Sequence, residues 1–544
     1  LPKYIYKIGL GEKKFPDNWF DEKKGENISH LNKYYGELTG IYWIWKNLYK
    51  NFDKNDLIGN CHYRKLWLNN HYEQKQKKTT QSLFNNLLKE NNPIFNKDKT
   101  FQVQPIVFKN KNLLDDFKII HNNDSLEKSI LFLDPGLQEN PYEAYEVLRK
   151  EAPVYLSPDT GFFVVSKYND LKRVLTDFEF FSRDLSGYWD KEIKEENKKN
   201  GYWKNGEKVK KVFMEKGWRQ IATFDSEPPN HTKYRKASNP SFTASKIRKM
   251  EPYIEILINE LIDEFIDDGE VEFISQFCIP LPMNIIQDRL GFPKKDLSKL
   301  KAWSFDTSEG LSQRLTEDEE IACAERLVKF QHYMNDTFEE KRKNPQEDII
   351  SDLVNFRFED GSQLITEELL SMVSALNIGG NETTTNSIAG GMLILMQQKE
   401  KLNDLITGKA KLKNFVEEII RLETPVQSLF RRVRKDVTLG DITIPEGSII
   451  DMRFGSANRD EDIFSCPMQM DLERKNPGKH LAYGISHHHC IGAPLARQEM
   501  RMAFDILLKR LKNINLAENK NDFLHHPHFA LRGLKELHLT FDKA

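Results

Sequence analysis

Apolar and polar side chains repeat with two different periods along most of this chain. In residues 248–268, 320–341 and 366–399, apolar positions recur every three to four residues, which predicts long amphipathic helices. Residues 154–166 and 436–452 instead contain short apolar runs separated by glycine, proline and aspartate, which predicts β-strands joined by turns. The pattern therefore predicts a mainly α fold with a small β region. Shorter helices are predicted at residues 142–151, 169–176 and 495–508.

The first part of the chain has a different character, because it is rich in aromatic and basic residues. Residues 25–46 predict a capped turn that leads into a helix, and the apolar run at residues 57–61 predicts a strand. A polar stretch then separates this part from a new apolar segment that begins at Ile130. We therefore expect two regions, a partial α/β segment at residues 1–128 and a mainly helical domain at residues 129–544.

Composition narrows the classes of function. The 544 residues carry a net charge of −2, which gives no electrostatic reason to expect nucleic acid or an acidic membrane as a partner. Five cysteines without paired spacing fit a reducing cytoplasm better than a disulfide scaffold. No apolar stretch approaches the ~20 residues that a membrane-spanning helix requires, and the N-terminus lacks a secretory signal pattern. We expect a cytoplasmic protein and, because the chain begins with Leu rather than Met, a fragment of a longer reading frame.

One cysteine lies in a position that suits metal ligation. Cys490 follows a loop rich in glycine and histidine and precedes the helix predicted at 495–508. A thiolate at a helix N-terminus is stabilised by the helix dipole and by free backbone N–H groups. A single cysteine cannot build a structural zinc site, but it can be the axial ligand of a haem iron. Gly492 lets the backbone turn under the sulfur, and His488 is placed to reach a haem propionate. The alternative is a buried structural cysteine beside a surface run of histidines.

The order of residues in this loop is also informative. It resembles the haem-binding loop of the cytochrome P450 monooxygenases in the order Tyr483-Gly484-x-Ser486-x-His488-x-Cys490-x-Gly492. Two positions differ, because Tyr483 stands where the family has Phe and Ser486 stands where it usually has Gly. The resemblance implies a haem-thiolate fold with haem b as cofactor and Cys490 as the axial ligand of its iron. It also implies that one oxygen atom of O₂ is inserted into a C–H bond of the substrate.

A second motif lies in residues 225–242. Two prolines can open a helix in which His231 and Arg235 are four residues apart and hence on one face. Two donors on one face can bind two carboxylates, and haem carries two propionates. The order D-x-x-x-P-x-H-T-x-x-R resembles the haem-contacting helix of the family, which implies that His231 and Arg235 bind the propionates. Alone, the two residues would also fit an ordinary surface pair.

A third motif interrupts the longest predicted helix. Gly379 and Gly380 are adjacent in its interior, where each glycine costs ~1 kcal/mol relative to alanine. A helix tolerates that cost where its backbone opens or where a flat ligand comes close. The order G-G-x-E-T resembles the oxygen-activating groove of the family, which implies that Thr383 handles oxygen and that Glu382 relays protons. A simple Gly-Gly kink is the alternative.

Further charged residues follow in the order that the family has. Glu418 and Arg421 are three residues apart, so they are neighbours on one helix face. The resemblance implies that they form a buried ion triad with Arg474 and that Arg431 is another propionate partner. An E-x-x-R pair alone is a very weak signal, because any surface helix supplies one.

The resemblance also implies partners. No glycine-rich fingerprint of a flavin or nicotinamide site follows a predicted strand, so electrons are expected from an external ferredoxin or flavodoxin-type protein. The substrate is expected to be a hydrophobic small molecule, with residues 184–218 either a lid over it or a solvated insertion. A haem-thiolate isomerase or peroxygenase is a competing class, although it would not need the pair Glu382–Thr383. Positive charge for docking the electron donor is expected from Lys233, Lys236, Lys475, Lys479, Arg497 and Arg501.

The N-terminal segment carries a separate resemblance. The sequence N-I-S-x-x-N at residues 27–32, the aromatic helix that follows it and His62-Tyr63-Arg64 resemble a bacterial family of capsular-polysaccharide glycosyltransferases. The resemblance covers residues 1–125, about half of such a domain, and no Asp-x-Asp pair is present to hold the metal of a nucleotide sugar. Half of a layered α/β fold leaves apolar edges uncovered. We therefore expect an inactive remnant, with glycosyltransferase-related activity as the alternative.

Overall fold

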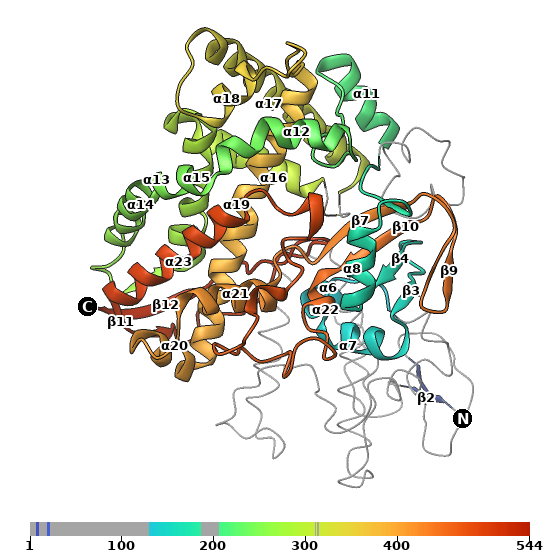
Figure 1. Cartoon of the computed structure of the whole chain (residues 1–544). Helices are drawn as coiled ribbons and strands as arrows, with labels where there is room; N and C mark the ends of the chain where they lie inside the picture. Colours follow the sequence, from blue (N-terminus) through green and yellow to red (C-terminus); the bar gives the residue numbers. More distant parts are fainter. Residues whose placement is uncertain (1–6, 10–18, 22–129, 186–205, 311, 313–314) are drawn as a thin grey trace, which may run out of the picture. The chain divides into compact units, whose positions relative to one another are not determined.

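The computed structural model describes residues 7–9, 19–21, 130–185, 206–310, 312 and 315–544 (Figure 1). The chain divides into two units, Leu1–Lys111 and Asn112–Ala544. In the first unit, β1 (Lys7–Gly9) pairs in parallel with β2 (Trp19–Asp21). The helix predicted at 25–46, the strand predicted at 57–61 and the predicted boundary near residue 128 lie outside the described residues.

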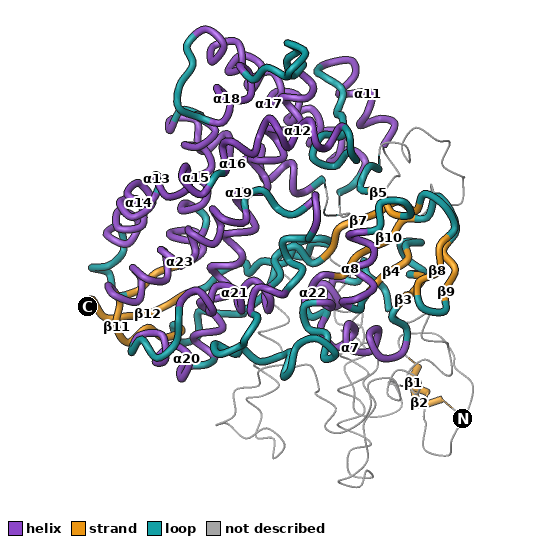
Figure 2. The backbone as a smooth tube through the Cα atoms, viewed as in Figure 1, coloured by secondary structure: helices purple, strands orange, loops and turns teal. Residues whose placement is uncertain are grey.

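Helices form most of the second unit (Figure 2), as the apolar periodicity predicts. The longest described helix, α19 (Thr366–Gln397), packs against several others, including α15, α16, α21 and α23. The other α-helices are α6 (Pro135–Glu139), α7 (Tyr142–Glu151), α8 (Tyr168–Thr176), α11 (Gly206–Lys216), α12 (Asn230–Ser238), α13 (Ala244–Lys249), α14 (Glu251–Asp263), α15 (Pro280–Leu290), α16 (Leu297–Glu309), α17 (Glu317–Lys343), α18 (Ile349–Asn355), α20 (Lys399–Ile406), α21 (Leu412–Glu423), α22 (Phe454–Ala457) and α23 (Ala493–Arg510).

The ends of α17 show how local sequence fixes a helix. Thr316 accepts a hydrogen bond from the backbone N–H of Glu319, and the Glu319 side chain accepts one from the backbone N–H of Thr316. This capping box satisfies two backbone donors that a helix leaves unpaired. Acidic residues fill the first turn and basic residues the last, which complements the helix dipole.

Three sheets accompany the helices in the described part of this unit. The largest has the order β3-β4-β10-β7-β5, in which β4 and β10 are parallel and the other neighbours are antiparallel. It therefore joins early and late parts of the unit, with Phe163 opposite Ile450. This sheet contains β3 (Val154–Leu156), β4 (Phe163–Val165), β5 (Phe181–Ser182), β7 (Ser428–Val433) and β10 (Ile449–Arg453). The second sheet contains β6 (Glu270–Glu272), β11 (Leu511–Leu516) and β12 (His538–Lys543). The third is a hairpin of β8 (Val437–Leu439) and β9 (Ile442–Ile444).

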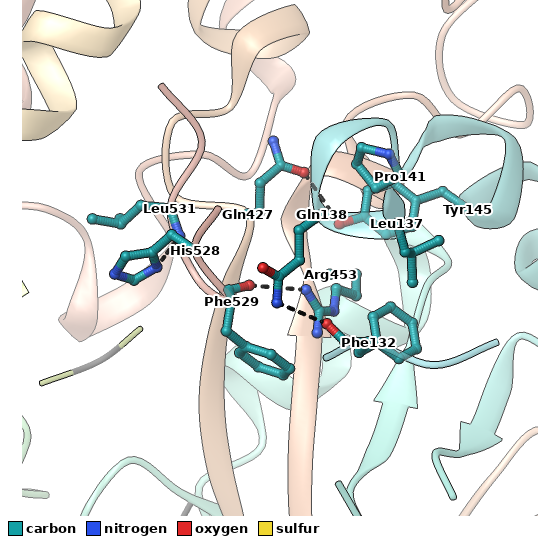
Figure 3. Close-up of a pocket in the computed structure, with 10 residues that line it drawn as sticks. All are labelled: Phe132, Leu137, Gln138, Pro141, Tyr145, Gln427, Arg453, His528, Phe529 and Leu531. Atoms are coloured by element: carbon teal, nitrogen blue, oxygen red, sulfur yellow. Dashed lines mark hydrogen bonds between the residues drawn. The ribbon is translucent and has the colours of Figure 1, made fainter. Parts of the chain in front are cut away.

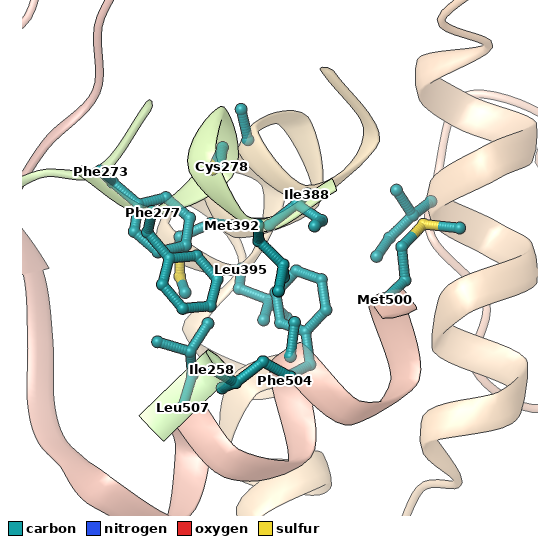
Figure 4. Packing of buried hydrophobic residues seen from close by; sticks show 14 of the residues in the cluster. Ile258, Phe273, Phe277, Cys278, Ile388, Met392, Leu395, Met500, Phe504 and Leu507 are labelled. Atoms are coloured by element: carbon teal, nitrogen blue, oxygen red, sulfur yellow. The ribbon is translucent and has the colours of Figure 1, made fainter. Parts of the chain in front are cut away.

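A large apolar core lies between α19 and the helices around it (Figure 4). Phe273 and Phe277 stack with ring centroids 5.2 Å apart, and Phe504 of α23 meets Phe415 of α21 edge-on at 4.8 Å. All four rings are fully buried, and each contributes about 2 kcal/mol relative to an exposed side chain. This packing fixes α23, and with it the loop that precedes the helix, against α19.

Within the described residues, the predicted elements agree with the structure apart from their ends, except that the helix predicted at 248–268 is divided between α13 and α14. The helix predicted at 142–151 is α7, α8 begins one residue before its prediction, and α23 extends the prediction at 495–508 on both sides. In the predicted lid, residues 206–216 form α11, where Phe213 packs on Val328 of α17, and residues 186–205 lie outside the described residues.

Candidate active site

A tight loop places Cys490 just before α23. The backbone N–H of Cys490 donates a hydrogen bond to the carbonyl of Tyr483 at 2.8 Å, which closes the loop. Gly484 and Ser486 have φ angles of +65° and +61°, in the left-handed region. A residue with a Cβ pays about 1 kcal/mol in that region, which explains why glycine suits position 486 and why serine there is a departure.

The surroundings of the Cys490 sulfur shift the pKa of its thiol in two opposite directions. The side chain is exposed on one side, but the protein around the rest of it raises the pKa of the thiol by desolvation. Hydrogen bonds from the backbone N–H groups of Gly492 and Ala493, followed by the charge of Arg235, lower the pKa and favour the thiolate. A sulfur with two N–H donors at a helix start suits a metal-bound thiolate.

Four of the predicted cofactor-binding side chains meet beside this loop. His231 and Arg235 come from α12, Arg431 from β7, and His488 from the loop itself. The rings of His231 and His488 lie with centroids 4.4 Å apart, and Arg235 donates to the carbonyl of His489 at 3.1 Å. We call these four residues the cationic cradle.

The cradle holds more positive charge than its surroundings balance. Arg431 is 2% exposed, and burial together with Arg183 lowers the pKa of its guanidinium to about 9. Burial and the neighbouring charges of the other histidines and arginines lower the pKa of His231 to about 3. The buried Nδ1 atom of His488 has no hydrogen-bond partner among the described residues. An anionic ligand would relieve this repulsion, and a group with two carboxylates fits it.

Three histidines in this region also raise the question of a metal cation. His231, His487 and His488 each offer a ring nitrogen within 4.8 Å of the others. Glu227 is the carboxylate that contacts two of them, with Oε2 3.4 Å from Nε2 of both His487 and His488. Three guanidinium groups, from Arg183, Arg235 and Arg431, act on the same cluster, so its electrostatics disfavour a cation.

The two adjacent glycines of the motif in α19 have different surroundings. The helix continues without a break through Gly379 and Gly380, so the adjacent glycines do not open it. A Cβ at Gly380 would lie 2.7 Å from Cγ1 of Ile286, whereas a Cβ at Gly379 would meet nothing within 4 Å. Gly380 is therefore needed for packing against α15, and Gly379 faces open space.

Glu382 and Thr383 have separate hydrogen-bond partners. Thr383 Oγ1 donates to the carbonyl of Gly379 at 2.9 Å, and Glu382 Oε2 accepts from Oγ of Ser308 at 2.7 Å. Burial raises the pKa of Glu382 to about 7, and the Ser308 hydrogen bond acts against that rise. A carboxyl group with a pKa near neutrality can both take and release a proton.

The predicted ion triad is assembled and buried. Glu418 accepts from Nε and Nη2 of Arg421 at 2.8 and 2.9 Å and from Nε of Arg474 at 2.8 Å. Arg421 donates three more hydrogen bonds, to the carbonyl oxygens of Asn458, Pro467 and Gln469. Burial alone would raise the pKa of Glu418, but the two arginines and the backbone N–H of Asp471 lower it. The triad thus fixes the segment that leads to the Cys490 loop.

Comparison with known proteins gives the family. Residues 411–538 match the cytochrome P450 family, and residues 3–150 match a domain of unknown function, DUF4422. The biotin biosynthesis cytochrome P450 of Bacillus subtilis (strain 168) is 30% identical over 411 residues, which cover 74% of this chain and 97% of that protein. This chain belongs to the cytochrome P450 family.

Other members of the cytochrome P450 family agree with this assignment. The cytochrome P450 monooxygenase PikC of Streptomyces venezuelae is 30% identical over 404 residues, covering 73% of this chain and 90% of that protein. The solved structure of the bacillaene polyketide synthase cytochrome P450 PksS of Bacillus subtilis 168 superposes with a TM-score of 0.66 at 28% identity, covering 76% of this chain and all of that one. The chain is thus a cytochrome P450 monooxygenase with the expected mainly helical fold.

Membership of the family determines the class of cofactor and the need for a redox partner. Cytochromes P450 bind a haem iron through a cysteine thiolate and need a redox partner. The DUF4422 match assigns no activity to the N-terminal segment. Within the described residues, we find no helix with the length and apolar character needed to cross a membrane.

The predicted docking charges of this cytochrome P450 are largely paired within the chain. Arg497 makes a bidentate contact with Glu417 at 2.6 and 2.9 Å, and Lys233 pairs with Glu368 at 2.6 Å. Arg497 thus neutralises a buried carboxylate, and its contribution to docking stays a prediction. Similar ion pairs join Lys236 to Glu359 and Arg501 to Glu251.

Sequence reasoning missed several residues that organise the loop. Glu227 accepts from the backbone N–H of Arg183 at 2.6 Å and contacts two loop histidines, and these interactions lower its pKa to about 2 despite burial. Its place directly before the two prolines that precede α12 was an available signal. His480 and Arg497 meet at Glu417, the neighbour of Glu418, and only the fold brings them together.

A small pocket lies apart from the Cys490 loop, between α6, α7 and the strands β7 and β10 (Figure 3). The guanidinium of Arg453 lies between the rings of Phe132 and Phe529, at 4.1 and 4.4 Å from their centroids. Tyr145 contacts Gln427 at 3.2 Å, and His528 lines the opposite side. None of the predicted site residues lines this pocket.

Proposed function

We propose that this cytochrome P450 hydroxylates a hydrophobic small molecule, with O₂ and electrons from an external ferredoxin or flavodoxin-type donor. The observation that carries the proposal is the convergence of Cys490, with its two N–H donors, and the cationic cradle of His231, Arg235, Arg431 and His488. In this proposal the thiolate of Cys490 would hold the iron of haem b, and the cradle would bind the two propionates. When bound, haem supplies the oxygen-activating chemistry of the family.

The remaining site residues receive roles in the same proposal. Gly379 leaves room for the cofactor face, Gly380 permits the close packing beneath it, and Gly492 donates an N–H to the sulfur. Glu382 relays protons, and the Thr383 hydroxyl contacts the oxygen. The triad Glu418, Arg421 and Arg474 holds the thiolate region in place.

The spectrum of the reduced carbon-monoxide complex tests the ligand. Cys490→Ala should abolish the red-shifted carbonyl band and turnover, because the thiolate is the source of that band. Cys466→Ala is the matched control, since Cys466 is also an exposed free cysteine and should keep the band. A red-shifted band in Cys490→Ala would overturn the assignment.

The competing haem-thiolate classes are separated by their use of oxygen. A monooxygenase consumes O₂ and reduced cofactor together with substrate, whereas an isomerase consumes neither and a peroxygenase uses peroxide. Thr383→Ala should release more peroxide per reduced cofactor consumed, because proton delivery is impaired. Turnover that proceeds without O₂ and reductant would replace the monooxygenase proposal.

For the N-terminal segment we propose a boundary near residue 128, with residues 1–128 an inactive remnant of the glycosyltransferase-like family that they resemble. Motifs at residues 27–32 and 62–64 support the likeness, and the missing Asp-x-Asp pair supports inactivity. A chain that starts at Ile130 should bind haem and keep the melting temperature of the full chain. Loss of haem binding on that deletion, or sugar transfer by the full chain, would contradict this proposal.

A further inference from the structure

Glu382 is attached to a neighbouring helix by one side-chain hydrogen bond. Ser308 lies at the end of α16, is 3% exposed, and its hydroxyl donates to Oε2 of Glu382 at 2.7 Å. The family motif contains Glu382 but not Ser308, which is 74 residues earlier in the chain. The contact therefore joins the proposed proton carrier to a helix outside the motif.

Ser308 is itself held from the other side by His528. Nδ1 of His528 accepts hydrogen bonds from the backbone N–H groups of Ala530 and Leu531, both at 3.0 Å. The ring hydrogen must then be on Nε2, which donates to the carbonyl of Ser308 at 3.1 Å. The backbone at Ser308 is thus held by α16 and by the loop at 528–531, and residues of that loop also line the pocket in Figure 3.

The Ser308 hydroxyl shifts the pKa of Glu382 in the direction opposite to burial. Burial is the largest influence and raises the pKa of Glu382 to about 7, and the nearby charge of Glu309 also raises it. The hydrogen bond from Ser308 stabilises the carboxylate and lowers the pKa. His528 contacts the backbone carbonyl of Ser308 rather than its hydroxyl.

We propose that Ser308 is a positioning residue for Glu382, whose hydroxyl holds the carboxyl group at the end of α16 and sets its readiness to release a proton. The inference rests on the proposed function, in which Glu382 passes a proton. Thr383 is hydrogen-bonded to Gly379 instead, so the position of Glu382 depends on α16 rather than on its neighbour in the motif. A movement of α16 or of the loop at 528–531 would then change proton delivery without touching the motif.

Ser308→Ala in the haem-containing full chain tests the inference. The protonated carboxyl band of Glu382, assigned by its loss in Glu382→Gln, is followed by infrared spectroscopy as a function of pH. In Ser308→Ala its titration midpoint should move to higher pH by about one pH unit, because a hydrogen bond to the carboxylate is lost. The pH at which peroxide release rises should move in the same direction.

Matched variants make the result decisive. Ser304→Ala removes a buried serine one turn earlier, whose hydroxyl contacts Asn381, and should leave the midpoint unchanged. Ser308→Cys keeps the size with a weaker donor and should shift the midpoint in the same direction by less, which decides the matter if Ser308→Ala does not fold. An unshifted midpoint in folded Ser308→Ala or Ser308→Cys would overturn the inference. Wild-type coupling in Glu382→Gln would instead overturn the proposed role of Glu382.

Discussion

Two groups of buried charge in this protein differ in how completely the chain satisfies them. Arg421 in the triad donates five hydrogen bonds, two of them to a carboxylate. Arg431 in the cradle is equally buried but donates one hydrogen bond among the described residues, to the carbonyl of Phe430. A buried charge that the chain satisfies serves stability, whereas one that it leaves unsatisfied indicates a ligand. Nη2 of Arg474 in the triad and guanidinium atoms of Arg453 and Arg459 are also buried without a hydrogen-bond partner among the described residues, so the contrast indicates a ligand only together with the position of Arg431 beside the Cys490 loop.

The largest expected effect comes from breaking the satisfied group. Arg421→Ala leaves the carboxylate of Glu418 buried with one partner fewer, which should lower the free energy of unfolding by about 3–5 kcal/mol. Urea denaturation followed by circular dichroism measures the loss. Lys150→Ala removes an exposed ion pair with Glu146 and should change stability by no more than about 0.5 kcal/mol. Equal losses in the two variants would contradict the contrast.

Removal of the arginine charge in the cradle should change ligand binding rather than stability. Arg431→Met keeps the side-chain volume and removes the buried charge, so the haem-free protein should be as stable as the wild type or more stable. Its affinity for haem should fall by about 10- to 100-fold, because a charge-assisted hydrogen bond to a propionate is lost. Haem titration and thermal unfolding of the same preparation give both numbers. Destabilisation without weaker haem binding would place Arg431 in the scaffold.

The cradle should also respond to pH in the haem-free protein. The pKa of His231 is about 3 in the folded chain against an ordinary 6.5, so between these values the unfolded chain binds more protons. Stability from this group is present above pH 6.5 and is lost as the pH falls toward 3. His231→Asn should flatten that part of the stability profile, measured as melting temperature against pH. A profile that His231→Asn leaves unchanged would remove His231 from the cradle.

The smallest effect is expected in the loop between the two groups. Ser486 lies on the chain between Arg474 and His488 and has a φ of +61°. Ser486→Gly should raise the free energy of unfolding by about 0.5–1 kcal/mol, because glycine adopts this conformation without a Cβ clash. Chemical denaturation resolves that gain, and Ser486→Ala, which keeps the Cβ, should not produce it.

Contacts between residues close together on one helix could be predicted from the sequence. Contacts between residues from distant segments could not, because only the fold brings those residues together. Helical spacing predicted that Glu418 and Arg421 are neighbours, and it placed His231 and Arg235 on one face. Residues that meet from distant segments gave no such signal, as with Ser308 beside Glu382 or Glu417 between His480 and Arg497. The roles of Arg474 and Arg431 were predicted from the family resemblance. Residues in the same motif order are expected to make the same tertiary contacts, which spacing along one helix cannot indicate.

The pairing of β4 with β10 also constrains how the protein is made. Phe163 lies opposite Ile450, so the largest sheet is completed only by a strand that the ribosome makes long after β4. Contacts between such distant segments form slowly, because a long loop must close before they stabilise the chain. Cys490 emerges later still, and the cradle combines residues of α12, β7 and the loop at 486–488. Cofactor insertion is therefore expected to follow the synthesis of both segments.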